Sequence, residues 1–307
     1  MFVPLSALLV GKRDDAQIIS VIKGGIGNQL FIYAAGLALS QKLVCELVLD
    51  GGSGFGSHDE YSRDYQLTNY LDIVHPHTHI GYNSRTRRLS LRLASRIPPL
   101  GLQIVPDVDL IGLLEVSSRG DFLLIAREKY VLDGYFQDWR IPDLVSDTLF
   151  YSFKKSSLDS AERDFHALCH DPENTAAVHL RRFECTPEED DFLRDYCWKL
   201  KTALDLQGVK QFVVFSEDVN LAQLALSIFG VQSAWAGSYQ RTDQEEFFLI
   251  SKFATIAITR STFGWWAAWL GSKAGATKRV FASGVPKTEG RSTWWPDKMV
   301  SPDWIEL

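Results

Sequence analysis

The sequence predicts an α/β protein whose parallel sheets are covered by helices, and three observations predict it. Short β-branched runs alternate with helical segments, most regularly in the second half of the chain. Segments rich in glycine, arginine or serine follow directly after several of these runs. The chain has 307 residues, of which 46% are hydrophobic, enough for a packed core. Alternating strands and helices are typical of parallel sheets, whose ligands bind beyond the carboxyl ends of the strands.

The first half begins with a strand, a glycine turn and a helix. The β-branched run at residues 16–23 stops at Gly24 and Gly25, and an alanine-rich helix is expected over 30–41. The remaining elements expected here are strands at 47–50 and 129–132 and helices at 84–96 and 158–169.

The second half is more regular. The expected strands are 176–180, 211–215, 255–258 and 280–282, and the expected helices are 188–205, 219–229, 243–252 and 263–270. A polar stretch at 171–174 marks the domain boundary, so we expect two domains, 1–172 and 173–307.

Charge and cysteine usage exclude several classes of protein. The net charge of −6 argues against nucleic acid as a partner, because its phosphate backbone needs a basic surface. The four cysteines show no C-x-x-C spacing and are expected to be reduced thiols. No apolar run approaches the roughly 20 residues of a membrane span. Residues 1–10 lack the charged start of a signal peptide, so a cytoplasmic protein is expected.

The most informative segment is VHLRRFE, residues 178–184, at the end of an expected buried strand. On a strand, His179 and Arg181 point to one face and Arg182 to the other. An arginine paired with Glu184 is the ordinary alternative, but two arginines at this edge favour a phosphate group, which suits their planar donors.

Two further strand-to-helix turns suit ligands. Gly25, Gly27 and Asn28 lie where backbone N–H groups and amides could meet an anion or a sugar hydroxyl, although a plain tight turn stays open. Ser261 or Thr262 can cap the next helix and leave N–H groups free for a phosphate. The tryptophans that follow, Trp265, Trp266 and Trp269, are expected in the core.

Two metal-like patterns are interpreted as accidental. Asp107 and Asp109 form a three-residue D-x-D match, which occurs easily by chance. His75, His77 and His79 alternate around a proline, with no nearby carboxylate or cysteine to complete a zinc site. We therefore expect no metal. The stripe of arginines on the expected helix 84–96 favours a solvated face, with contact to an anionic membrane as the sharper alternative.

Taken in order, these motifs resemble the α-1,2-fucosyltransferases that use GDP-fucose. The family's opening stands here as GGIGNQLFIYAAGLAL, residues 24–39, and its H-x-R-R motif as residues 179–182. Its GYFQ segment stands at 134–137, its S-x-D segment at 216–218, and its S-[ST]-F-[SG]-x-W-A-A-x-L stretch at 261–270. The matches run from Lys23 to about Leu270.

The resemblance implies a GT-B-like fold of two Rossmann-like domains with parallel sheets facing a cleft. It implies an inverting, metal-independent enzyme without a cofactor, whose N-terminal domain takes the acceptor and whose C-terminal domain holds GDP-fucose. The implied acceptor is a galactose-terminated or lipid-linked glycan, which would place the protein at the inner face of the membrane. The implied catalytic residues are His179, Arg182 and Glu184; the implied donor-binding residues are Gly25, Gly27, Asn28, Arg181, Ser216, Asp218, Ser261, Thr262 and Phe263.

Departures from the family pattern leave alternatives open. Family members commonly carry Gly-Asp after the two arginines, where this chain has Phe183 and Glu184, and many bacterial members have Asn where Arg260 stands. A transferase that uses another sugar nucleotide, a non-catalytic carbohydrate-binding protein and a metal-dependent hydrolase are the competing classes.

Overall fold

The structure, a computed structural model, is described at residues 16–55, 63–73, 75, 77–78, 102–105, 110–111, 114, 129–183, 185–230, 233–236, 241–284 and 297–307. The chain divides into two compact units. The first comprises Met1–Thr68 and Asp72–Leu149, and the second comprises Asn69–Leu71 and Phe150–Leu307. This division lies earlier in the chain than the expected boundary after residue 172, because helix α7 (Lys155–Leu168) packs on helix α10 (Asp243–Ile250) of the second unit.

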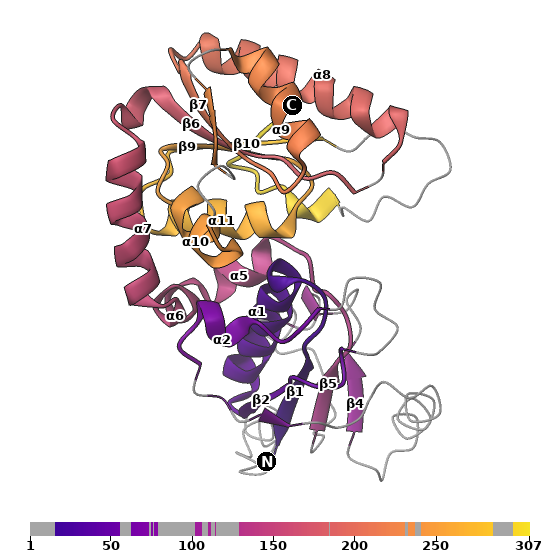
Figure 1. Cartoon of the computed structure of the whole chain (residues 1–307). Coiled ribbons are helices and arrows are strands. Elements are labelled where there is room, and N and C mark those ends of the chain that lie inside the picture. The colour runs from indigo at the N-terminus through magenta and orange to yellow at the C-terminus, as the bar shows by residue number, and fades with distance from the viewer. Residues whose placement is uncertain are drawn as a thin grey trace, which may run out of the picture. The chain divides into compact units, whose positions relative to one another are not determined.

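The first unit contains a five-stranded sheet in the order β3-β2-β1-β5-β4, and every neighbouring pair is parallel. Its strands are β1 (Gln17–Val21), β2 (Glu46–Asp50), β3 (His77–Thr78), β4 (Leu102–Val105) and β5 (Lys129–Leu132). Helix α1 (Ile26–Leu43) packs against β1, β2 and helix α5 (Arg140–Leu144), as Figure 1 shows.

Helix α1 begins four residues before the expected start at residue 30. Gly25 is its N-cap, and the N–H of Gln29 already donates to the Gly25 carbonyl at 3.0 Å. Gly27, Asn28 and Gln29 therefore lie in the first helical turn rather than in the preceding loop. Helix α1 buries nearly its whole surface, which explains why its apolar residues surround the axis.

The second unit contains a six-stranded parallel sheet in the order β11-β10-β9-β6-β7-β8. Its strands are β6 (Thr175–His179), β7 (Gln211–Phe215), β8 (Ser233–Trp235), β9 (Thr255–Ile258), β10 (Arg279–Ala282) and β11 (Ile305–Glu306). Besides α7 and α10, its helices are α8 (Pro187–Asp205), α9 (Val219–Phe229) and α11 (Thr262–Lys273). Helices α8 and α9 lie on one face of the sheet, and α10 and α11 on the other (Figure 1).

Alternating residues of β6 divide between the two faces of this sheet. Ala176, Val178 and Leu180 belong to the core cluster formed with α8 and α9. His179 lies on the opposite side, where its ring stacks on Phe263 of α11. The predicted two-sided burial of this strand is therefore confirmed.

Short connecting elements complete the described chain. They are helices α2 (Leu67–Tyr70) and α6 (Ser146–Ser152) and the 3-10 turns Pro172–Asn174 and Asp297–Met299. The three expected core tryptophans are confirmed, each at most 4% exposed. Within the described ranges, no helix is long and apolar enough to cross a membrane. Residues 1–10, the expected helix 84–96, Asp107, Asp109, His79 and Glu184 lie outside the described residues.

Candidate functional site

The carboxyl edge of the six-stranded sheet brings together the three segments that the sequence singled out. Strand β6 lies between β7 and β9, so the segments after these strands are neighbours. The N–H of Leu180 donates to the Phe215 carbonyl at 2.9 Å, and the N–H of Thr259 donates to the His179 carbonyl at 3.1 Å. The H-x-R-R turn is thus hydrogen-bonded to the strand ends on both sides.

His179 is a buried, neutral imidazole. Burial, reinforced by the charge of Arg181, lowers the pKa of His179 to about 3. Its ring stacks on Phe263 with 5.3 Å between centroids. Its Nδ1 has no hydrogen-bond partner among the described residues. A Cβ on Gly264 would lie 2.8 Å from that nitrogen, so the first turn of α11 closes this side of the ring.

The two arginines follow the end of β6 and have different partners. Arg182 lies on the α8/α9 side, with its Nη2 3.2 Å from Asp190 Oδ1 and its Nε 3.1 Å from Asp218 Oδ2. Arg181 Nη1 lies 2.8 Å from Glu217 Oε1. The Glu217 side chain is 68% exposed, whereas the Asp190 and Asp218 side chains are 39% and 25% exposed. Arg182 thus lies beside two carboxylates, but its Nε and Asp190 Oδ1 have no hydrogen-bond partner among the described residues, so these contacts are ion pairs without hydrogen-bond geometry.

Helices α9 and α11 begin at this edge, each with a side-chain cap. Asp218 caps α9, because its Oδ1 accepts from the N–H of Leu221 at 3.0 Å, and the Ser216 hydroxyl accepts from the N–H of Asp218 at 3.2 Å. Ser261 caps α11 and accepts from the N–H of Gly264 at 3.4 Å. Thr262 is the first residue of α11. The positive end of that helix dipole is therefore available to an anion at the sheet edge.

Sequence reasoning missed a buried ion pair beside the arginine turn. Glu189 Oε1 lies 3.3 Å from Arg260 Nη2, and both residues are less than 9% exposed. The only sequence signal was that Arg260 stands where many family members carry asparagine.

In the first unit, the side chain of Gln29 is hydrogen-bonded to three backbone groups. Its buried amide donates to the carbonyls of Gly24 (2.9 Å) and Asp64 (2.8 Å), and accepts from the N–H of Gln66 at 2.8 Å. These three hydrogen bonds tie the first turn of α1 to the loop before α2.

Asn28 lies one residue earlier and contacts the GYFQ segment. Asn28 Oδ1 accepts from Gln137 Nε2 at 2.8 Å. Gly24 adopts φ +74°, and a Cβ on Gly25 would lie 2.2 Å from Arg63 Nη1, so neither glycine has room for a side chain without rearrangement. A side chain at either glycine would therefore require its neighbours to move, and Asn28 is hydrogen-bonded to Gln137.

Asp138, which follows the GYFQ segment, is engaged by an arginine. Its carboxylate accepts from Arg140 Nε at 2.9 Å and from Arg140 Nη2 at 2.6 Å. Phe136 adopts φ +53°, an uncommon conformation for a bulky residue, and is 1% exposed. Such a backbone persists only where its surroundings fix it.

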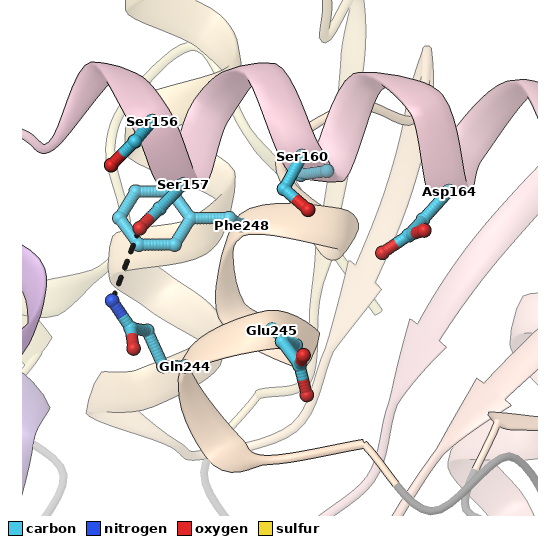
Figure 2. A pocket seen from close by; sticks show the side chains of 8 residues that line it. Ser156, Ser157, Ser160, Asp164, Gln244, Glu245 and Phe248 are labelled. Atoms are coloured by element: carbon cyan, nitrogen blue, oxygen red, sulfur yellow. Dashed lines mark hydrogen bonds between the residues drawn. The ribbon is translucent and has the colours of Figure 1, made fainter.

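A separate hollow of about 210 Å³ lies between α7 and α10 (Figure 2). Figure 2 shows the hydrogen bond that the amide of Gln244 donates to the hydroxyl of Ser157. The two atoms are 3.1 Å apart. The hollow is lined by Ser156, Ser157, Ser160, Ala161, Asp164, Gln244, Glu245 and Phe248, none of which belongs to the predicted site. In the part of the chain that the structure describes, no three His, Cys, Asp or Glu side chains are grouped to hold a metal ion.

The chain is similar to known glycosyltransferases. The model of glycosyl transferase family 11 matches residues 127–306. The O-antigen biosynthesis glycosyltransferase WbnK of Escherichia coli is 26% identical over 314 residues, which cover 94% of this chain and 99% of the relative.

The fold is also similar to solved fucosyltransferase structures. NodZ alpha-1,6-fucosyltransferase soaked with GDP-fucose has a TM-score of 0.56 and 15% identity, covering 87% of this chain and 94% of that chain. A mutant of Arabidopsis thaliana FUT1 in complex with GDP has a TM-score of 0.52 and 11% identity, covering 85% and 70%. These similarities confirm the expected GT-B class of α/β fold with parallel sheets.

Proposed function

As a member of glycosyl transferase family 11, the chain is a glycosyltransferase, and we propose that it moves L-fucose from GDP-β-L-fucose to the 2-hydroxyl of a galactose-terminated glycan. The observation that carries the proposal is the sheet edge of the second unit. There the H-x-R-R turn after β6 lies beside the Ser-Thr-Phe helix start after β9.

The donor site is proposed from the charges and dipoles at that edge. Arg181, Arg182 and the first turn of α11, with Ser261 and Thr262, would bind the diphosphate, since arginines and helix N-termini both favour phosphate. Ser216, Asp218 and Phe263 are proposed to complete the donor site of the second unit. Gly25, Gly27 and Asn28 stay predictions from the resemblance. The crystallised NodZ and FUT1 relatives, which hold GDP or GDP-fucose, support the nucleotide class.

We propose an inverting displacement without a metal. The acceptor oxygen forms a bond to the fucose anomeric carbon while the bond from that carbon to the diphosphate oxygen breaks, and GDP leaves with the electron pair. Preorganised cationic groups and N–H donors stabilise the charge that develops on the leaving diphosphate. Arg182, which lies beside Asp190 and Asp218, is suited to this role.

The acceptor hydroxyl must also lose a proton, and Glu184 is the proposed base. His179 and Asp138 are the other groups considered as the base. The pKa of His179, lowered to about 3, makes its imidazole a weak base. The Asp138 carboxylate is occupied by two hydrogen bonds from Arg140. Glu184→Gln should therefore lower turnover while GDP binding persists.

The acceptor is proposed to be a lipid-linked or polysaccharide glycan handled at the cytoplasmic face of the membrane. The similarity to an O-antigen biosynthesis glycosyltransferase supports this class. Contact of residues 84–96 with anionic lipid stays the alternative to the solvated face that their sequence favours. Co-sedimentation with anionic but not neutral liposomes tests that contact, and background levels with both would contradict it.

Calorimetry with GDP and UDP in EDTA tests the donor proposal. We expect GDP to bind and UDP to bind much more weakly, with no need for a divalent ion. Tighter binding of UDP would favour a transferase of another donor specificity. Binding of neither nucleotide would favour a non-catalytic carbohydrate-binding protein.

A further inference from the structure

We infer that Glu189 is a positioning residue, which acts with Arg260 to fix the turn that carries Arg181 and Arg182 and thereby sets donor affinity. The effect on donor affinity rests on the proposed function; the effect on the turn does not.

One carboxylate of the first turn of α8 joins two segments of the sheet edge. Glu189 Oε1 accepts from the N–H of Phe183 at 3.1 Å, and it lies 3.3 Å from Arg260 Nη2. Phe183 directly follows Arg182, and Arg260 directly precedes Ser261, the cap of α11. The Glu189–Arg260 pair therefore links the arginine turn after β6 to the helix start after β9.

The geometry of α8 shows that Glu189 serves this link in addition to its own helix. Helices α8 and α10 both begin with a T-x-x-E pattern, Thr186 to Glu189 and Thr242 to Glu245. In α10 the glutamate reaches back to its own cap, where Glu245 Oε2 accepts from the N–H of Thr242 at 2.8 Å and closes a capping box. In α8, Thr186 caps the helix at the N–H of Glu189, while the Glu189 carboxylate extends to Phe183 and Arg260.

Because both side chains of the Glu189–Arg260 pair are buried, the contact is sensitive to the loss of either charge. Glu189 is 6% exposed and Arg260 is 8% exposed, and the Arg260 guanidinium also lies 5.2 Å from the centre of the Phe192 ring. A buried ion pair contributes little net stability, but removing one partner leaves an uncompensated charge. The pair is therefore better explained by the arrangement it imposes on the turn than by stability alone.

Three variants and a matched control test the inference. Glu189→Gln keeps an acceptor for Phe183 but removes the charge, Glu189→Ala removes both, and Glu189→Gln with Arg260→Met removes the pair. Glu173→Gln is the control, because Glu173 of the same unit forms an exposed ion pair with Lys278 at 2.7 Å.

Donor binding and kinetics separate positioning from simple destabilisation. We expect Glu189→Gln to raise the GDP dissociation constant and the donor KM at least tenfold, with the acceptor KM and the control variant unchanged. The double variant should recover thermal stability but not GDP affinity. A Glu189→Gln protein whose kcat falls only because a smaller share of the enzyme is active, with unchanged GDP affinity, would overturn the inference. So would a double variant with wild-type GDP affinity.

Amide exchange in donor-free protein tests the turn without any assumption about the donor. Glu189→Ala should speed exchange of the Phe183 amide at least tenfold, and Glu173→Gln should leave it unchanged. Equal protection of the Phe183 amide in wild type and Glu189→Ala would overturn the positioning role. Wild-type protein that binds no GDP would instead overturn the proposed function, and the amide result would still decide the role of Glu189.

Discussion

At the scale of single residues, strand alternation predicted opposite sides for His179 and Arg182, although strand β6 itself ends at His179. His179 lies on the α11 side, and Arg182 lies among the carboxylates of the α8/α9 side. Period-two alternation is a backbone property, so sequence alone could predict it. The partners could not be predicted, because Asp218 is distant in sequence and Asp190 is brought back by the start of α8.

The difference between the two arginines predicts different effects of removing them. Arg182→Ala should abolish transfer and weaken GDP binding roughly 10- to 100-fold, because a hydrogen bond to a charged group contributes about 1.5–3 kcal/mol. Arg181→Ala should weaken GDP binding without abolishing transfer, since its protein partner Glu217 is exposed. Titration calorimetry and turnover assays measure both effects.

Arg194→Ala is the matched control for the arginine variants. Arg194 forms an exposed pair with Asp191 on α8 and should be neutral in both assays. An Arg182→Ala protein with near wild-type turnover would contradict the assignment of that residue.

The lowered pKa of His179 predicts a dependence of stability on pH. Between about pH 6.5 and pH 3, the unfolded chain binds a proton at this histidine that the folded protein does not. Stability therefore falls as the pH falls through this window, by up to about 1.4 kcal/mol per pH unit from this residue. Urea unfolding of wild type and His179→Gln at several pH values isolates the contribution. Equal slopes for the two proteins would show that His179 titrates normally.

At the scale of elements, the strands and helices of the second unit were predictable and their ends were less so. Strands β7 and β9 and helix α9 match the expected bounds, because each combines an apolar run with a clear polar or glycine boundary. Strands β8 and β11 were missed, since segments of three and two residues carry no periodicity. Helix α1 starts earlier than expected. Its cap is Gly25, which has no side-chain oxygen, so the sequence carries no capping signal there.

The start of α9 provides a test of an element that also serves the site. Asp218 caps the helix and pairs with Arg182. Asp218→Asn keeps a capping oxygen and should leave the free energy of unfolding near wild type, whereas Asp218→Ala should lower it by about 1 kcal/mol. Both variants should change GDP affinity to the same extent, because both remove the carboxylate beside Arg182.

Thr242→Ala removes the cap of α10 and controls for helix destabilisation. It should lower the free energy of unfolding by a similar amount and leave GDP affinity unchanged. Equal stability losses in Asp218→Asn and Asp218→Ala would show that the cap is not the stabilising contact.

At the scale of the whole molecule, the sequence predicted the family and the fold class, and both are confirmed. Local motifs at strand ends are sufficient to predict the family and the fold class, because a parallel sheet places such segments along one edge. The division into units was less predictable, because α7 precedes the polar stretch at 171–174 yet packs on α10 of the second unit. The tertiary partners Glu189 and Arg260 likewise depend on packing between distant segments, which no local pattern records.

The most direct test of the central claim is product analysis by mass spectrometry after incubation with GDP-fucose, EDTA and a panel of galactose-terminated glycans. The proposal predicts that at least one acceptor gains a single deoxyhexose, linked to the galactose 2-hydroxyl, and that GDP-mannose and UDP-sugars give no product. Transfer that requires added Mn²⁺, transfer to another hydroxyl, or transfer from a UDP-sugar instead of GDP-fucose would contradict it.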